Sequence, residues 1–199
     1  MNLDLFGNGE ALASPFPEGQ LSAPDAFADR VVMGFDLGAH GAAAVADADL
    51  GGRLETIGLA LPGKTEDLAQ RAYWWAAAVA HLLTSYGPMA VAYEDAHYVG
   101  AQAASQNWLR RQEGILLAEC YAREIVVVGV PTPTVRAHMV KVRGVKRPEK
   151  GQAKRAAQGG AAGLGWIPTA WVGMKRYEDQ ADAAWVADWL RHQHWVTGA

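Results

Sequence analysis

Apolar residues recur along this chain with two different periods, which predict a mixture of strands and helices. From Arg30 to Asp36 they alternate, with Val31, Met33 and Phe35 on one side, as in a strand that buries one face. After Thr65, which we expect to be an N-cap, they recur with the 3.6-residue period of a helix. The apolar positions of that helix are Leu68, Ala72, Trp75, Val79, Leu82 and Tyr86.

The same two periods predict the remaining elements. Glycines and prolines mark the ends of several of them, as at Gly51-Gly52 and Gly87-Pro88. Further strands are predicted at residues 42–47, 54–61, 89–94 and 125–130. Further helices are predicted at residues 102–123, 150–157 and 178–192, with a glycine-rich break over residues 159–165. The main elements therefore follow the order βββαβαβα.

This order predicts an α/β fold with a mixed five-stranded sheet flanked by helices. The first, fourth and fifth strands are joined by helical crossovers, so they should be parallel. The second and third strands follow tight turns and should lie antiparallel at the edge beyond the first strand. The first and fourth strands are then neighbours, with their carboxyl ends at one edge of the sheet.

Carboxylates lie at the points that this topology brings together. Asp36 ends the first strand and Glu94 ends the fourth. Asp179 and Asp182 are three residues apart near the start of the last helix, so they project from one face. Glu178 lies four residues before Asp182 and could replace Asp179. Ligands of open α/β sheets bind at this edge, which makes the four carboxylates a candidate site.

Such a cluster needs cations. Two like charges about 4 Å apart repel by about 4 kcal/mol at an effective dielectric constant of 20. Oxygen-only ligands suit Mg²⁺ or Mn²⁺. Two such ions about 3.5–4 Å apart can activate a water and stabilise the leaving oxygen of a phosphodiester. We therefore expect two metal ions per site, and a nuclease.

The charge distribution points to a polyanionic partner. Residues 136–155 contain eight basic residues and one acidic residue. This segment therefore has a charge of +7, within a chain of net charge −3. The rest of the chain carries −10, so the basic segment stands out as a local contact for nucleic acid. The residues expected to bind DNA there are Lys141, Arg143, Lys146, Arg147, Lys154 and Arg155.

Composition also bounds the organisation of the chain. Residues 1–29 hold three prolines and no periodic apolar pattern, so we expect a flexible extension before one domain over residues 30–199. No apolar run approaches the length of a membrane-spanning helix, which is about 18 residues. The expectation is a cytoplasmic protein, in a bacterial cell or a phage-infected host, with no membrane partner.

Five segments in order resemble motifs of the RuvC-type Holliday-junction resolvases, in particular divergent phage and bacterial forms within the ribonuclease H-like fold. The similarity covers about residues 30–192. The segments are Gly34–Ala42, Tyr93–Tyr98, Ser105–Gly114, Glu149–Gln152 and Asp179–Ala183.

The resemblance implies roles for single residues. It assigns metal binding and catalysis to Asp36, Glu94, Asp179 and Asp182. It assigns Lys150 to stabilising the charge of the transition state, which suits the negative charge that the phosphate gains there. His97 or Tyr98 would stack on an opened base pair. Lys141 lies about two positions away from a lysine usual in the family.

The resemblance also implies an assembly and a substrate. A resolvase of this type is a homodimer that makes paired nicks in four-way or branched DNA. From the apolar pattern of the helix at residues 102–123, we expect Trp108, Leu109, Leu116 and Ala104 to form the dimer interface.

Three other functions stay open. Residues Gly58 to Thr65 fit the letters GxxxxGKS/T of a P-loop ATPase, but the loop interior is apolar and has no further glycine to wrap a phosphate. A ribonuclease H-like nuclease on RNA or RNA–DNA hybrid would use the same carboxylates. A DNA-binding protein of this fold could also have lost cleavage.

Overall fold

The computed structural model describes residues 30–38, 41–49, 51–59, 61, 67–95, 103–149 and 151–193. Its centre is one sheet of five strands in the order β3-β2-β1-β4-β5. β1 pairs antiparallel with β2 and parallel with β4, and β4 pairs parallel with β5, as predicted. The strands are β1 (Val31–Asp36), β2 (Ala42–Asp47), β3 (Leu54–Gly58), β4 (Ala90–Asp95) and β5 (Val126–Pro131).

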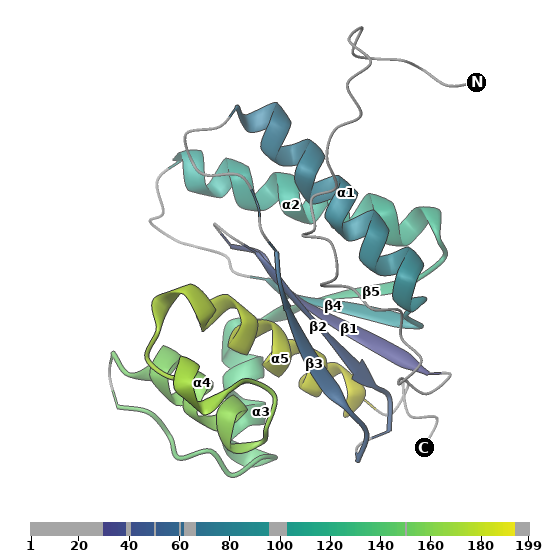
Figure 1. Cartoon of the computed structure of the whole chain (residues 1–199). Helices are drawn as coiled ribbons and strands as arrows, with labels where there is room; N and C mark the ends of the chain where they lie inside the picture. The colour runs from purple at the N-terminus through teal and green to yellow at the C-terminus, as the bar shows by residue number, and fades with distance from the viewer. Residues whose placement is uncertain are drawn as a thin grey trace, which may run out of the picture.

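Helices cover both faces of the sheet, so the central strands are buried on both sides (Figure 1). The helices are α1 (Leu68–Tyr86), α2 (Ala103–Ala122), α3 (Thr132–Lys141), α4 (Ala153–Gly163) and α5 (Glu178–Arg191), with two short 3-10 turns before α5 at Thr169–Trp171 and Lys175–Tyr177. α1 and α2 lie on one face, and α5 crosses the other face with α3 and α4 beside it. In the described part of the chain, no helix is long and apolar enough to cross a membrane.

α1 follows the predicted apolar period. Trp75, Val79 and Leu82 are buried on its inner face. Asp67 caps the helix, its carboxylate accepting a hydrogen bond from the Ala69 amide at 3.3 Å. Gly87 ends it in the left-handed conformation, φ 54°. The predicted cap Thr65 lies outside the described residues.

Small residues allow α5 to lie directly on β1. A Cβ atom at Gly34 would lie 2.3 Å from the Ala187 amide nitrogen and 2.5 Å from the Ala183 carbonyl oxygen. The strand neighbours of Gly34 in the sheet are Ala44 and Ala92, which are also small and buried. This alanine-lined contact sets the height of α5 above the sheet.

The region between β5 and α5 differs from the sequence prediction. It contains α3, over residues for which the sequence predicts no helix or strand. Pro133 lies in the first turn of α3, where a helix needs no amide donor. The predicted glycine-rich break is also wrong, since α4 runs on through Gly163.

Packing explains why α4 tolerates glycine. A Cβ atom at Gly160 would lie 2.8 Å from the Trp185 ring and 2.9 Å from a methyl carbon of Val145. The Trp185 indole also donates a hydrogen bond to the Ala157 carbonyl at 2.9 Å. The helix therefore gains from tertiary contact what glycine costs it in propensity.

The predicted dimer interface on α2 is wrong for Trp108 and Leu116, and the side chain of Ala104 lies outside the described part of the chain. Trp108 and Leu116 are buried inside the domain, where they pack with α1 and the sheet, and Leu109 is partly buried against the same cluster. The Trp108 indole donates a hydrogen bond to the Gly38 carbonyl at 3.2 Å, and the Arg71 guanidinium lies 4.2 Å from the centre of its ring. The apolar stripe serves the fold and leaves the interface unassigned.

Gly34→Val should destabilise the domain by about 1–3 kcal/mol or more, because every atom that a side chain would meet first belongs to the α5 backbone. Urea unfolding measures the change. Gly114→Ala is the control. A Cβ atom there meets nothing within 4 Å, so we expect no loss and a gain of up to about 1 kcal/mol. Equal effects of the two substitutions would contradict the close contact between α5 and β1.

Candidate active site

The alternation of side chains along β1 and β4 places Asp36 and Glu94 on the same face of the sheet. Phe35 is level with Tyr93, and both pack on the face that α1 and α2 cover. The next residue of each strand therefore faces α5. Both carboxylates lie at the carboxyl ends of neighbouring parallel strands, as the sequence predicted.

α5 brings the other two carboxylates to this edge. A Cβ atom at Gly38 would lie 3.2 Å from a carboxylate oxygen of Asp179, so the chain just after β1 passes close beneath that side chain. Asp36, Glu94, Asp179 and Asp182 all line one cavity of about 490 Å³. Glu178 is not among its lining residues, which favours Asp179 over Glu178 as the ligand.

The crowding of these carboxylates shifts their proton affinity. Burial raises the pKa of Asp36 well above its ordinary value, and the charges of Asp182, Asp179 and Glu94 raise it further, against a lowering by Lys154. Burial also raises the pKa of Asp182 to about 6, although Lys154 opposes the shift. The site therefore holds more negative charge than its surroundings stabilise, which is the condition for binding a cation.

Two neighbours already interact with the site carboxylates. The Thr132 hydroxyl, in the first turn of α3, donates a hydrogen bond to the Glu94 carboxylate. The Lys154 ammonium, in the first turn of α4, lies 3.4 Å from the Asp182 carboxylate and 3.4 Å from that of Glu178. Both helices that follow β5 thus point their amino ends at the carboxylate cavity.

The donor set fits a hard divalent cation. All four groups are carboxylates, the ligands that Mg²⁺ and Mn²⁺ prefer, and Asp179 lies in the first turn of α5, where the helix dipole favours an anion. Among the described residues, the three ligating groups found within 4.8 Å of one another are those of His138, Asp188 and His192. The four site carboxylates stand farther apart, so a cation would have to draw their side chains together.

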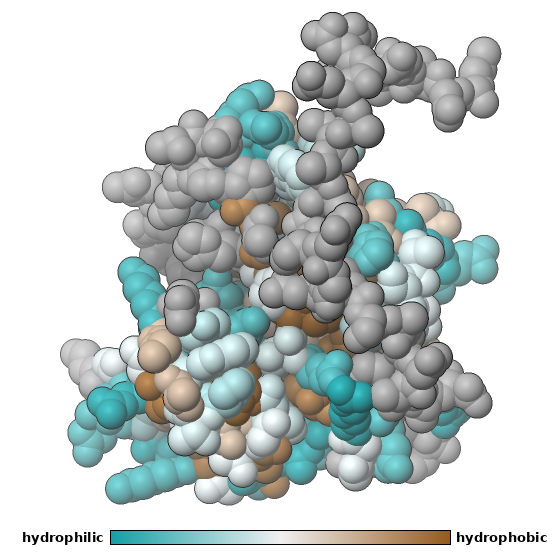
Figure 2. All heavy atoms as spheres, viewed as in Figure 1, coloured by the Kyte–Doolittle hydropathy of each residue, from teal (hydrophilic) through white to brown (hydrophobic). Residues whose placement is uncertain are grey.

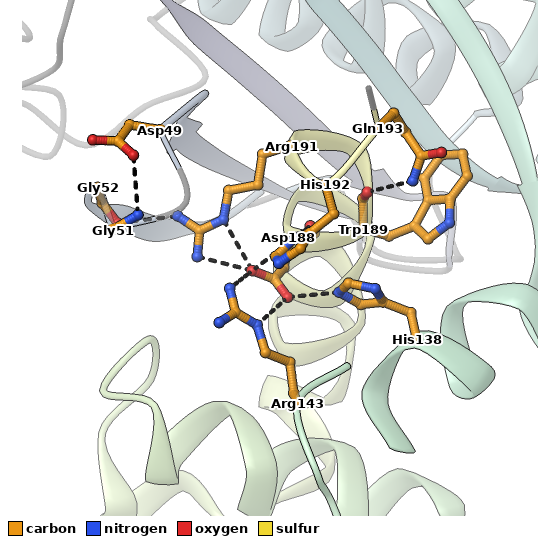
Figure 3. Close-up of polar contacts among 10 residues, drawn as sticks. All are labelled: Asp49, Gly51, Gly52, His138, Arg143, Asp188, Trp189, Arg191, His192 and Gln193. Carbon is orange, nitrogen blue, oxygen red and sulfur yellow. Dashed lines mark hydrogen bonds and ion pairs between the residues drawn. The ribbon is translucent and has the colours of Figure 1, made fainter. Parts of the chain in front are cut away.

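The His138, Asp188 and His192 group is a buried ion network (Figure 3). Asp188 is fully buried, and its oxygens accept hydrogen bonds from Arg143, Arg191 and His138 at 2.5 to 2.9 Å. Arg191 also donates to the Gly52 carbonyl at 3.0 Å. Two guanidinium groups already compensate the single carboxylate, so the network has no charge left for a metal ion.

This network bears on one predicted DNA contact. Arg143 binds Asp188 through two nitrogens, and its side chain is only 21% exposed. Its charge is therefore already paired inside the domain, and the structure gives it a role in holding the segment after α3 to α5. Lys141, Lys146, Arg147 and Arg155 are exposed, as DNA contacts must be.

Other predicted residues lie outside the described part of the chain, namely Lys150, His97 and Tyr98. The first residue of the basic segment 136–155, which is not among the residues expected to bind DNA, does lie at the site. Arg136, on α3, lines the carboxylate cavity. It also lines an adjoining cavity of about 440 Å³ with Lys141 and Arg147. The signal that could have found it was the helical period of Val135 and Met139, which are buried on α3 and place Arg136 beside them.

The comparisons with known proteins bear on the fold. No protein-family model and no curated protein matches the chain. RuvC of T. thermophilus, solved in complex with a Holliday junction substrate, is 19% identical with a TM-score of 0.61, over 84% of this chain and 97% of that one. The chain has the fold of RuvC.

Two further structures agree. A second Thermus thermophilus RuvC structure is 21% identical with a TM-score of 0.59, over 80% of this chain and 92% of that one. The yeast mitochondrial Holliday junction resolvase Ydc2 is 14% identical with a TM-score of 0.55, over 84% of this chain and 82% of that one. The predicted RuvC-like, ribonuclease H-like fold class is confirmed.

The RuvC fold also accounts for the glycine that opens the P-loop pattern. Gly58 ends the edge strand β3, and a Cβ atom there would lie 2.7 Å from the side-chain nitrogen of Gln180 on α5. Packing against α5 therefore explains this glycine without a nucleotide. Lys64 and Thr65 lie outside the described residues.

Asp188→Asn should destabilise the domain by about 3–5 kcal/mol at pH 7, because Arg143 and Arg191 would keep their charge with no carboxylate to compensate it. Burial favours the neutral acid, but hydrogen bonds from Arg143 and His138 outweigh it and hold the pKa of Asp188 well below its ordinary value. The stabilisation is thus complete above the unfolded-state pKa of about 4 and is lost as the pH falls toward the lower folded-state pKa.

Denaturant unfolding between pH 3 and pH 7 tests this. The difference between parent and Asp188→Asn should shrink with acidification. Asp49→Asn, at an exposed carboxylate that accepts from the Gly51 amide, should change stability little at any pH. A difference between parent and Asp188→Asn that stays constant across this range would contradict the buried ion network.

Proposed function

We propose that this protein is a metal-dependent endonuclease that resolves four-way or branched DNA junctions by paired phosphodiester hydrolysis. One observation carries the proposal: Asp36, Glu94, Asp179 and Asp182, from three separate elements, line a single cavity at the edge of a RuvC-fold sheet. The solved structures with this fold include RuvC bound to a Holliday junction and a mitochondrial junction resolvase.

The four carboxylates would hold two Mg²⁺ or Mn²⁺ ions. Bound there, such ions lower the pKa of a water and stabilise the charge on the attacking and leaving oxygens. The chain's own contribution is geometric. β1 and β4 fix Asp36 and Glu94, α5 fixes Asp179 and Asp182, and Thr132 orients the Glu94 carboxylate. Each carboxylate stands on a regular element, so its backbone position is fixed and only the side chains would have to move together around a cation.

The adjoining cavity gives the DNA strand a path. Arg136 lines both cavities, and Lys141 and Arg147 line the second, so cationic side chains lead away from the carboxylates over α3. Hydrophilic side chains project from the region where Figure 1 places α3 and α4 (Figure 2). A phosphate backbone is the ligand that a row of basic residues beside a metal site recognises. Lys146, Arg155 and Lys154 extend the basic surface.

The proposal gives Lys150 the role of stabilising the charge of the transition state. It gives His97 or Tyr98 the role of stacking on an opened base pair.

A second subunit completes the proposal. Paired nicks require two sites, and one chain supplies one set of carboxylates. A closed two-fold dimer is the simplest arrangement that presents two equivalent sites to the two-fold symmetry of a four-way junction.

Asp36→Asn should abolish cleavage of a labelled four-way junction in Mg²⁺ while retaining junction binding in EDTA, because it removes a metal ligand and none of the basic surface. Gel assays of cleavage and binding measure the two. The control is Asp49→Asn, far from the cavity and exposed. Normal cutting by Asp36→Asn would refute the metal site.

Duplex DNA, RNA–DNA hybrid and ATP are tested separately as alternative substrates of the parent protein. Cleavage of the hybrid alone would favour a ribonuclease H-like nuclease, and ATP turnover would favour a P-loop ATPase.

Arg136 and Arg147 should separate cleavage from binding. Arg136→Ala should slow cleavage of bound junction by about 10²–10³, the usual scale for one preorganised charge stabiliser beside the reacting group. Arg147→Ala should weaken binding and reduce the slope of log affinity against log salt by about 1, with little change in the single-turnover rate at saturation. If both variants lose rate only in proportion to affinity, Arg136 is a backbone contact as well.

A further inference from the structure

Lys154 occupies a position that DNA binding alone does not explain. It stands in the first turn of α4, and its ammonium lies equally far, 3.4 Å, from carboxylate oxygens of Glu178 and Asp182 on α5. Its side chain is 52% exposed, so it reaches the cavity from the solvent side. Asp36 and Asp179 also lie within its electrostatic reach. The side chain thus interacts with three of the four carboxylates that line the cavity.

The carboxylates need such a charge in the absence of metal. Four of them line one cavity, and Asp36 is only 9% exposed, so water screens their repulsion poorly. Lys154 forms an ion pair with the cavity carboxylate of Asp182 and a second one with Glu178, which lies on α5 outside the cavity lining. A cation bound by Asp182 would take up the oxygen that the ammonium now contacts.

We propose that Lys154 is a built-in counter-ion that stabilises the metal-free site and competes with divalent cations for the α5 carboxylates. Metal loading displaces the ammonium from Asp182. This inference rests on the proposed function, which identifies the cavity as a metal site. It adds an account of what stabilises the carboxylates before a metal ion binds.

The displaced ammonium has a second partner available. Its flexible four-carbon stem starts on α4, whose first residue Ala153 lines both the carboxylate cavity and the adjoining basic one. A DNA phosphate there offers the negative charge that the carboxylates no longer provide. Metal binding and DNA binding then each favour the released position of Lys154, and by linkage each strengthens the other.

Mn²⁺ binding to the purified full-length protein, followed by calorimetry without DNA, tests the proposal. Lys154→Met keeps the length of the stem and removes the charge. It should bind Mn²⁺ about tenfold more tightly than the parent, which corresponds to about 1.4 kcal/mol. Its melting temperature in EDTA should be lower than that of the parent, and its stabilisation by Mn²⁺ should be larger. Lys154→Arg, which keeps a cation, should bind Mn²⁺ like the parent.

The matched control is Arg155→Met. Arg155 is the next residue, equally cationic and exposed, so its loss changes the net charge by the same amount. It should leave Mn²⁺ affinity and stability in EDTA unchanged. An affinity in Lys154→Met that is equal to or weaker than the parent's would overturn the inference, as would equal strengthening in Arg155→Met, which would mean a general charge effect.

The outcome is separable from that of the proposed function. If Asp36→Asn loses Mn²⁺ binding and Lys154→Met gains it, the counter-ion role holds even where no junction is cut. If the parent and both variants bind no Mn²⁺, the metal site itself is wrong and the inference falls with it. A junction cut normally by Lys154→Met with unchanged Mn²⁺ affinity supports the function and overturns the counter-ion.

Discussion

The rest of the structure depends on how closely α5 approaches β1. Gly34 has no side chain at the point where α5 crosses β1. The amide of Ala187 and the carbonyl of Ala183 fill the space that a side chain would take. Alanines on β2 and β4 widen this flat contact. A larger residue at the crossing would lift α5 from the sheet. Asp179 and Asp182 would rise with it, away from Asp36 and Glu94, so a packing constraint at mid-strand sets the spacing of the site.

The second element that positions the site lies on the opposite face. Trp108 of α2 donates to the Gly38 carbonyl, while Asp179 lies against Gly38 from the α5 side. Tyr93, next to Glu94, donates a hydrogen bond to the Glu113 carboxylate at 2.7 Å, also on α2. The ends of β1 and β4 are therefore held from below by α2 as well as from above by α5. This accounts for the burial of the α2 stripe that resembled an interface.

The sheet and the convergence of carboxylates were predictable because both follow from local periods and from one topological rule. Alternation located β1 and β4, and parallel pairing of neighbours placed Asp36 beside Glu94. The segment between β5 and α5 was not predictable in the same way. Its helices depend on tertiary contacts, such as the packing of Trp185 against Gly160 in α4. A sequence rich in glycine predicts a break there, because the sequence does not reveal this packing. Arg143 looked like its basic neighbours in sequence, yet its partner Asp188 lies 45 residues away in α5.

The carboxylates at the two ends of α5 are neutralised in different ways. At its carboxyl end, Asp188 is neutralised permanently by guanidinium groups of the same chain. At its amino end, the Asp182 carboxylate is paired with the half-exposed ammonium of Lys154. Two divalent ions bound there would add four positive charges to a formal net charge of −3 and carry the molecule to +1. The ions would thus reverse the sign of the molecule's net charge and would add a long-range attraction for a DNA junction to that of the basic segment over residues 136–155.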